Sequence, residues 1–318
     1  METVDSRLLT ARAEALLFYS PYNFLRAVSA DRQQELFGMG HFARLSAGDN
    51  EVVTTMEERE KVQLLHTELP WDSEFFGTRT VKFQTALFEP AVPLAERVAA
   101  VRTWQTRLAA QGDYYCFGEI PTEDTKLLQT LTASGWRLVE TRLLFYHDNL
   151  AGFEHPRYPV RPARLDEANL VGEISATARN NYDRFHADTW FGEEKADAFL
   201  ARYASAAVQG YCDTVLVPNE PGLPVDSFLA ISDLHGDAEA LGIGLSRVVL
   251  TAVGPQNRGW HLRLVAETVQ RARANAAEYV LMTTQATNRA VFRTSEKLGF
   301  KLGGSTHILA CHGGPEPT

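Results

Sequence analysis

Residues 253–262 combine residue types and spacing that suit a bound diphosphate. Gly254 interrupts a strand-like run, and Gly259 precedes a helix-like one. The first turn of a helix has N–H groups without intrahelical acceptors and the positive end of the helix dipole, and both favour a pyrophosphate. Arg258 and Arg263 add charge-assisted hydrogen-bond donors. The alternative is an ordinary strand-to-helix turn, in which the glycines serve only the geometry of the backbone.

A second group of polar residues follows at 285–300. Asn288 precedes a helix-like run and suits the N-cap, because its side-chain oxygen accepts from first-turn N–H groups. Ser295 lies seven residues further on, and therefore on the same face of the helix. Gly299 suits the left-handed position that ends many helices. Each residue has a structural explanation, so the functional hypothesis depends on the order and spacing of the series.

The elements that position these residues alternate between strands and helices, which indicates an α/β architecture. The strongest predicted strand is 247–253, which is rich in β-branched residues. The helix after it, 258–276, has its apolar residues on one face. The other predicted strands are 80–87, 114–118, 138–146, 214–217, 227–231, 279–284 and 301–310, and the other predicted helices are 94–110, 125–134, 166–178, 196–208 and 289–298.

An internal repeat relates two parts of the chain. A shift of 164 residues places 114–145 over 278–309 without a gap, and the identical residues include Tyr115 and Tyr279. Strand, helix, glycine–aromatic turn and strand coincide, which favours two copies of one fold over chance similarity. Only the second copy has the glycine-bearing loop, so we predict that the first copy is a degenerate lobe.

Composition restricts the class of protein. The 318 residues include 31 basic and 40 acidic ones, and the net charge of −9 argues against general affinity for nucleic acid or an anionic membrane. No apolar run approaches the ~20 residues of a membrane span, and the first residues show no secretory signal. The three cysteines are far apart in sequence, which argues against a disulfide framework or a metal site. We therefore expect a cytoplasmic protein without a metal.

Residues 248–300 resemble the C-terminal half of the GNAT superfamily, the acyl-CoA-dependent N-acyltransferases. The signature loop of that superfamily is Gln/Arg-x-x-Gly-x-Gly/Ala, and Gln256, Gly259 and His261 occupy its three positions. His261 departs from the pattern, which has a small residue there. The opening strand and helix of the superfamily match 159–168, so the resemblance covers 159–310. It implies an α/β (α+β) GNAT fold, with a mixed central sheet flanked by helices.

The resemblance also implies acetyl-CoA as co-substrate, with direct attack of an amine on the thioester. In the superfamily, the pantetheine arm lies where the strand matching 247–253 splays from the strand matching 279–284. Trp260 has an alternative role in packing beneath the loop, and His261 has three: crowding the phosphates, bonding one of them, or pointing outward. The implied cofactor-binding residues are Val253, Gln256, Asn257, Arg258, Gly259, Trp260, His261 and Asn288.

Proton transfer is where the sequence departs from the superfamily. Relatives have a tyrosine acid four residues before the glycine of the Gly-Phe turn, and Ser295 stands at that position. Serine is a poor acid and a thiolate leaves tolerably well unaided, so we expect Ser295 to tune the rate. His186 is the first candidate for the general base, because imidazole titrates near neutral pH; a solvated loop histidine is the alternative. The other candidates are Asp183, His235 and His307.

Three shorter segments, 69–77, 182–188 and 284–288, resemble nucleotide-sugar N-acetyltransferases of the TDP-fucosamine type. This likeness implies an acceptor amine on a nucleotide-linked amino-dideoxy sugar, and a role in polysaccharide biosynthesis. The implied substrate-binding residues are Asp183, Arg184 and His307. The alternatives are another small amine, such as an antibiotic, amino acid or peptide, and a catalytically weak CoA-binding protein.

The predicted division of the chain is an N-terminal extension at 1–65, a degenerate GNAT-like lobe at 66–150 and a catalytic GNAT domain at 159–318. The expected partner is a small-molecule substrate, with neither nucleic acid nor membrane. The oligomeric state is left open, and a homodimer is possible.

Overall fold

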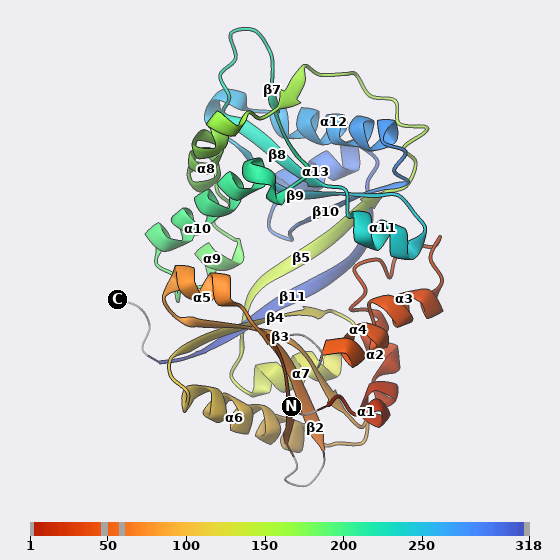
Figure 1. The fold of residues 1–318 in the computed structure, drawn as a ribbon, viewed down its shortest axis with the longest axis vertical. Coiled ribbons are helices and arrows are strands. Elements are labelled where there is room, and N and C mark those ends of the chain that lie inside the picture. Colours follow the sequence, from red (N-terminus) through yellow and green to blue (C-terminus); the bar gives the residue numbers. More distant parts are fainter. Residues whose placement is uncertain (1–2, 46–49, 57–60, 315–318) are drawn as a thin grey trace. The chain divides into compact units, whose positions relative to one another are not determined.

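The protein forms two compact units in a computed structural model that describes residues 3–45, 50–56 and 61–314. The first unit comprises Met1–Thr141 with Ser305–Thr318, and the second comprises Arg142–Gly304. In both, helices flank a mixed sheet (Figure 1), so the expected fold class is confirmed. Among the described residues, none of the helices has the length and hydrophobicity that crossing a bilayer requires.

In the first unit, the strands have the order β1-β2-β3-β4-β11. Its core contains stacked and tilted aromatic rings, with Trp104 and Trp136 at 6.4 Å and Phe83 beside both. The elements are α1 (Ser6–Ala11), α2 (Ala13–Leu17), α3 (Ala30–Leu36), α4 (Met39–Arg44), β1 (Glu51–Met56), β2 (Val62–Glu68), α5 (Pro70–Phe76), β3 (Arg79–Phe88), α6 (Leu94–Ala109), β4 (Tyr114–Pro121), α7 (Thr125–Ala133) and the end of β11 (Lys301–Gly313).

Helices α1, α2 and α4 supply a second hydrophobic cluster of the first unit. Leu8 and Leu16 are buried in one cluster with Leu65 of β2 and Leu87 of β3. Burial of apolar side chains is the main favourable contribution to folding, and it fixes these helices to the sheet. The described residues of the segment predicted as an N-terminal extension thus provide four helices and two strands of the first unit.

In the second unit, the strands have the order β5-β10-β9-β8-β7-β6. Helices α12 and α13 pack with Leu229 and Ile231 of β8. Helices α8 and α10 pack with Phe228 and Ala230 of the same strand, since successive side chains of a strand face opposite sides of the sheet. The elements are β5 (Arg137–His147), β6 (Val160–Pro162), α8 (Ala168–Thr177), α9 (Arg184–Ala187), α10 (Glu193–Ala206), β7 (Thr214–Pro218), β8 (Ser227–Ser232), α11 (His235–Leu241), β9 (Leu245–Val253), α12 (Trp260–Ala274), β10 (Tyr279–Gln285) and α13 (Arg289–Lys297).

The 164-residue repeat is confirmed by these boundaries, because α7 shifted by that distance coincides with α13. Both helices have a side-chain cap at the same position: Asp124 accepts from the N–H of Leu127, and Asn288 accepts from the N–H of Val291. The glycines that end the two helices both have positive φ, +94° at Gly135 and +76° at Gly299.

The first repeat ends with β5 and the second ends with β11. Each of these two strands pairs with a strand of the other repeat. β4 of the first repeat pairs with the C-terminal strand β11, with Ile308 opposite Glu119. β10 of the second repeat pairs with β5, with Met282 opposite Phe145. Both pairings are antiparallel. The first unit is therefore completed by a strand from the C-terminal end of the chain, and the second by the strand that ends the first repeat.

Candidate functional site

Two parallel strands of the second unit diverge where the sequence predicts a cofactor-binding gap. The ladder between β9 and β10 runs from the pair Leu245–Tyr279 to the pair Val248–Met282 and ends there. β9 continues beside β8 as far as Val253. The register of the β8–β9 pairing shifts between Ala230 and Ile231 of β8, which leaves one extra residue, a β-bulge, in β9. A bulge bends and twists its strand, so it gives a physical reason for the divergence.

The loop after β9 is held by Asp226, which directly precedes β8, and by Ser227, the first residue of β8. The backbone N–H of Gly254 donates to the carbonyl oxygen of Asp226 at 2.7 Å, and the N–H of Gln256 donates to its carboxylate at 2.7 Å. Asn257 is fully buried. Its Oδ1 accepts from the hydroxyl of Ser227 at 2.7 Å and from the N–H of Asp226 at 3.1 Å. The side chain of Asn257 therefore holds the loop in place, whereas that of Gln256 is exposed.

The loop ends at the N-terminus of α12. Gly259 has φ of +90° and ψ of −8°, and a Cβ there would meet no atom within 4 Å, so the backbone conformation alone favours glycine. In the part of the chain that the structure describes, no side chain caps α12, which leaves its first-turn N–H groups available to an anion. Arg258 is exposed beside them. Trp260 is buried in the core beneath the loop, and the guanidinium of Arg263 stacks over its ring at 4.9 Å.

His261 points from the first turn of α12 toward α13, which makes the outward-pointing interpretation wrong. Its Nδ1 lies 3.1 Å from Oγ1 of Thr294. Its Nε2 is buried and has no hydrogen-bond partner among the described residues. Burial lowers the pKa of the His261 imidazole to about 4, so the ring is neutral near pH 7.

Helix α13 presents two of the predicted residues. Asn288 is the N-cap, and its Oδ1 accepts from the N–H of Val291 at 3.2 Å. Ser295 is fully buried, and its hydroxyl donates to the carbonyl oxygen of Val291 at 2.9 Å. The Ser295 hydroxyl is thus engaged within its own helix, an arrangement common for serine in helices.

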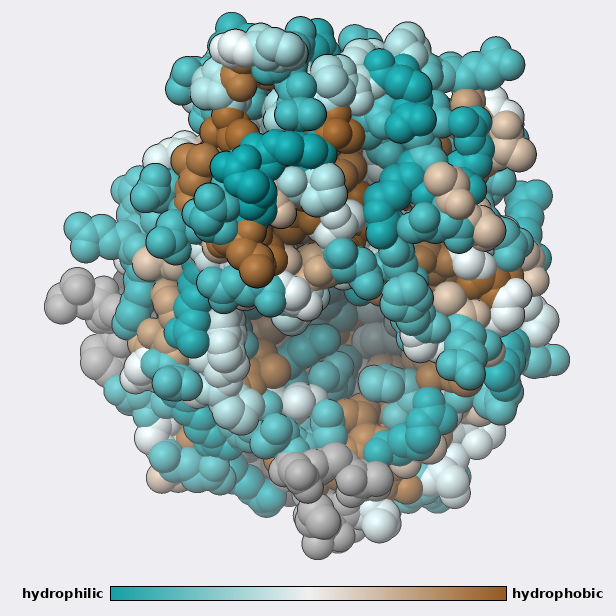
Figure 2. Space-filling view, turned by 45° about the horizontal axis from the view of Figure 1, so that its top comes forward, coloured by the Kyte–Doolittle hydropathy of each residue, from teal (hydrophilic) through white to brown (hydrophobic). Residues whose placement is uncertain are grey.

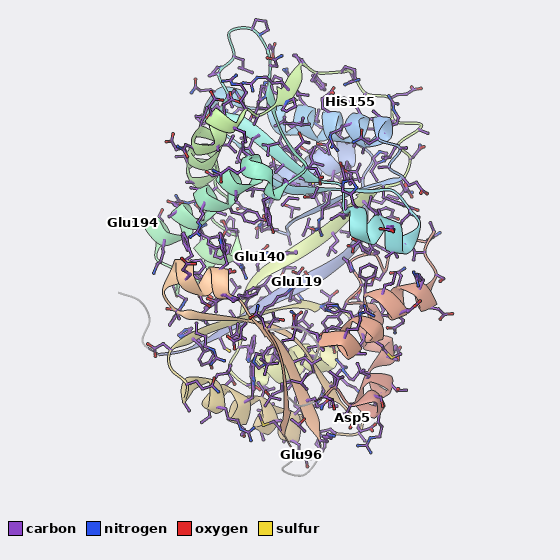
Figure 3. All side chains as sticks on the ribbon, in the orientation of Figure 1. Asp5, Glu96, Glu119, Glu140, His155 and Glu194 are labelled. Atoms are coloured by element: carbon purple, nitrogen blue, oxygen red, sulfur yellow. The ribbon has the colours of Figure 1, made fainter. Side chains whose placement is uncertain are left out.

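His186 lies in α9, between two carboxylates. Its Nδ1 is 2.8 Å from Oδ2 of Asp183, and its Nε2 is 3.0 Å from Oδ1 of Asp197 in α10. Arg179 also donates to Asp197, at 2.7 Å to each carboxylate oxygen. Glu194 marks this end of α10 in Figure 3. Because both ring nitrogens face carboxylates, these contacts favour a structural role for the imidazole.

The three predicted substrate residues are divided between the units. Asp183 caps α9, and Arg184 stacks over Phe185 at 4.3 Å. His307 belongs to the first unit, because β11 pairs with β4; its Nδ1 lies 3.0 Å from the hydroxyl of Thr141. None of the other predicted site residues lies in that unit.

The sequence pattern did not identify three residues that support the loop and strands of the gap: Asp226, Thr294 and Asn180. Asp226 follows a turn-rich stretch with no recognisable motif. Thr294 coincides with Thr130 in the repeat, and that identity was an available signal. Asn180 donates to the side-chain oxygen of Gln285 at 2.9 Å, which ties the loop before α9 to the end of β10.

One group of described side chains, Asp213, Asp233 and His235, has the spacing of a metal site. Both carboxylate oxygens of Asp233 already accept hydrogen bonds from Arg271 at 2.8 Å, and Ser246 donates to one of them. The guanidinium therefore balances the charge of Asp233, and we interpret the cluster as an ion-pair network.

Comparison with solved structures identifies the architecture. A GCN5-related N-acetyltransferase from Sphaerobacter thermophilus matches over 99% of this chain and 98% of its own, with a TM-score of 0.56 at 14% sequence identity. A tandem GNAT protein from the clavulanic acid biosynthesis pathway matches over 100% and 98%, with a TM-score of 0.51 at 14% identity. The chain has the GNAT fold. Its two repeats form a tandem GNAT-like architecture that extends over the whole chain.

A third similar structure is a GCN5-related glucosamine N-acetyltransferase region in a fungal multi-domain β-N-acetylglucosaminidase. It has a TM-score of 0.54 at 10% identity, and the match covers 94% of this chain and 37% of that one. No family model matches the sequence, and no curated protein matches it. In the GNAT fold found here, the diverging strands β9 and β10 and the loop before α12 belong to the second copy.

Proposed function

We propose that this protein is an N-acetyltransferase that transfers the acetyl group of acetyl-CoA to a small amine, with its active site in the second unit. The observation that carries the proposal is the end of the β9–β10 ladder at Val248, next to an uncapped α12. Acetyl-CoA supplies the thioester, from which the amine takes the acetyl group. Holding two reactants in a productive geometry contributes up to about 7–11 kcal/mol to such reactions.

The residues around the gap fit the coenzyme by their chemistry. Gly259 leaves the first-turn N–H groups of α12 open to a pyrophosphate, and exposed Arg258 adds positive charge. Val253 ends the strand whose ladder with β10 has already stopped, so its backbone is our proposed contact for the pantetheine arm. Gln256 and Asn257 support the loop through Asp226 and Ser227.

Proton transfer in this proposal does not depend on one strong acid. We propose that Ser295 tunes the rate through its place in α13, since its hydroxyl is bonded to Val291. His186 is our candidate for positioning the loop before α10, through Asp183 and Asp197. A base function for His186 requires that one ring nitrogen leave its carboxylate.

For the acceptor, we propose the amine of a nucleotide-linked amino-dideoxy sugar, in a pathway of polysaccharide biosynthesis in the cytoplasm. Two observations support an amino sugar: the likeness of residues 182–188 to enzymes of that kind, and the similarity to a region named a glucosamine N-acetyltransferase. Asp183 and Arg184 are the candidate contacts for this acceptor, and both lie in the second unit. Another small amine is the second candidate, and the net charge of −9 favours a cationic acceptor.

The test combines calorimetric titration of the intact chain with a thiol-release assay. We expect acetyl-CoA to bind, and free CoA to appear when an amine from a panel of nucleotide-linked amino sugars is added. Arg258→Ala should weaken acetyl-CoA binding about tenfold, with a reduced salt dependence, because it removes an exposed cation. Arg107→Ala, which removes an exposed arginine of α6, is the matched control.

Three results would separate the alternatives. Turnover only with amines other than nucleotide sugars would replace the acceptor and keep the activity. Tight acetyl-CoA binding without transfer to any amine would make the chain a CoA-binding protein. No binding of acetyl-CoA at millimolar concentration would overturn the proposal itself.

A further inference from the structure

One ring nitrogen of His261 is the feature of the gap that the other contacts leave unexplained. Nε2 is buried and has no partner among the described residues, whereas Nδ1 has the hydroxyl of Thr294 at 3.1 Å. A buried polar group without a partner destabilises the folded state, because it has given up its hydrogen bonds to water, so such groups call for a specific explanation. The fold does not require a histidine here, because GNAT signature loops have glycine or alanine at this position.

The first unit shows what the same position does without a cofactor loop. A shift of 164 residues places His261 over Arg97 and Thr294 over Thr130. Arg97 donates to the carbonyl oxygen of Lys126 in α7 at 3.1 Å, and the Thr130 hydroxyl donates to the same carbonyl at 2.7 Å. In the first unit the side chain thus reaches a backbone acceptor of the neighbouring helix. In the second unit, the Thr294 hydroxyl lies 3.1 Å from Nδ1 of His261, and Nε2 of the same ring has no hydrogen-bond partner among the described residues.

We propose that Nε2 of His261 hydrogen-bonds an amide group in the pantetheine arm of the bound coenzyme. This inference rests on the proposed function. His261 follows Trp260, the first residue of α12, and its ring contacts Thr294 of α13, the neighbour of Ser295. The ring therefore lies between the loop at residues 254–259, which we propose binds the diphosphate, and α13. A neutral imidazole has one donor and one acceptor nitrogen, so with Thr294 on Nδ1 it offers Nε2 as either.

An amide fits this nitrogen better than a phosphate does. The ring is neutral and its Nε2 is buried, so it contributes no charge against a dianionic diphosphate, whereas an amide offers both a carbonyl oxygen and an N–H. The diphosphate already has the uncapped N-terminus of α12 and Arg258. His261 would therefore position the arm, and act on the reaction only through the placement of the thioester.

The experiment compares two probes on the intact chain: acetyl-CoA, and acetyl-pantetheine, which lacks the diphosphate and adenosine. His261→Phe keeps a ring of similar size and removes the hydrogen-bonding nitrogen. We expect it to weaken the binding of both probes by about tenfold or more, since a buried donor or acceptor on the ligand loses its partner. His261→Gln, which keeps a polar group at similar reach, should recover most of the loss. His41→Phe is the control, because His41 is exposed in α4 of the first unit.

A second readout does not depend on the stability of any variant. In the wild-type protein labelled at histidine with nitrogen-15, the Nε2 resonance of His261 should move when acetyl-pantetheine binds, because its hydrogen bond is new. Weakened binding of acetyl-CoA with unchanged binding of acetyl-pantetheine would assign His261 to the diphosphate and overturn the inference. Equal affinities in wild type and His261→Phe, with no resonance shift, would overturn it while the proposed function stands. If the wild type bound neither acetyl-CoA nor acetyl-pantetheine, both this inference and the proposed function would be overturned.

Discussion

At the scale of single residues, hydrogen bonds divide the signature loop into residues that build it and residues that are open to a ligand. Asn257 and the backbone of Gln256 build it, because their polar groups are engaged by Asp226 and its neighbours. Arg258 and the N-terminus of α12 remain open. Spacing along the sequence cannot separate these groups, since adjacent residues of a tight turn point in different directions.

Asn257→Ala should therefore act mainly on stability. Removing the amide leaves the buried Ser227 hydroxyl and the Asp226 N–H without their acceptor, at a cost of about 2–4 kcal/mol in the free energy of unfolding. We expect acetyl-CoA binding to weaken as well, because the loop loses its support. Urea denaturation and calorimetric titration measure the two effects. Gln256→Ala removes only an exposed side chain, and a comparable destabilisation in that variant would contradict the explanation.

Burial of His66 makes stability depend on pH. Burial lowers the pKa of His66 in β2 to about 4, despite the opposing charge of Glu68; Arg79 acts in the same direction as burial. The folded state therefore holds the neutral ring while the unfolded chain gains a proton below about pH 6.5. The resulting stabilisation, about 3 kcal/mol, is complete above pH 6.5 and is lost as the pH falls toward 4.

His66→Phe should reduce this dependence by the share that His66 contributes, because the site beside Trp104 stays filled and that titrating group is gone. His41, His147 and His261 keep their own contributions, since burial lowers the pKa of each. The measurement is the free energy of unfolding of wild type and variant at pH 7 and pH 5. A variant that loses as much stability on acidification as the wild type would exclude His66 as the cause.

At the scale of elements, two backbone features make the gap: the bulge in β9 and the left-handed residue before α12. The bulge separates β9 from β10 after Val248, and Gly259 at φ of +90° begins α12 without a side-chain cap. The first unit has a corresponding divergence, since the β3–β4 ladder ends at Phe83 opposite Gly118. It has no counterpart of Gly259, because Ala95 stands at that place in the repeat.

Gly259→Ala should reduce acetyl-CoA affinity about tenfold or more. An L-residue at this φ costs about 1 kcal/mol in place, and relaxation of the backbone would turn the first-turn N–H groups away from the ligand. Gly135→Ala is the matched control, because Gly135 also has positive φ and open space around it, at the end of α7. The two variants should lose similar stability, and only Gly259→Ala should lose affinity. Equal affinity in both would rule out a role of the α12 N-terminus.

At the scale of the whole molecule, the two copies of the fold have different residues, and different contacts, at corresponding positions. In the first unit, Asp124 stands where Asn288 stands in the second, and it forms a buried ion pair with Arg12. The hydroxyl of Tyr19 also donates to Asp124, at 2.9 Å. A cavity of about 290 Å³ beside this pair is lined by both charged residues and by Phe88. The segment that corresponds to the phosphate loop contains prolines at 90 and 93 and no glycine.

We therefore expect one molecule of acetyl-CoA per chain, bound in the second unit. Asp124→Asn should lower the free energy of unfolding by about 3–5 kcal/mol, since it leaves the Arg12 charge buried without its partner. Scanning calorimetry measures that loss, and calorimetric titration should show an unchanged affinity and a stoichiometry of one. Two binding events, or loss of affinity in Asp124→Asn, would contradict this assignment. The face in Figure 2 is mostly hydrophilic, with hydrophobic residues in patches between.

Local sequence determined most of the elements. The predicted strands and helices from residue 80 onward lie within a few residues of those in the structure, because period and capping are local properties. The Asn288 cap and the left-handed Gly299 were predictable for the same reason. The short helices α5 and α11 were not predicted, because seven residues carry too little periodicity.

Tertiary structure decided which strands pair and what each side chain meets. The sequence contains two copies in order, yet β5 completes the second unit and β11 the first, so His307 lies in a different unit from the other predicted site residues. Packing of separate elements also placed His186 of α9 against Asp197 of α10, and it left Nε2 of His261 without a hydrogen-bond partner among the described residues. Strand pairing depends on the packing of the whole chain, and the environment of a side chain depends on neighbours that no local pattern identifies.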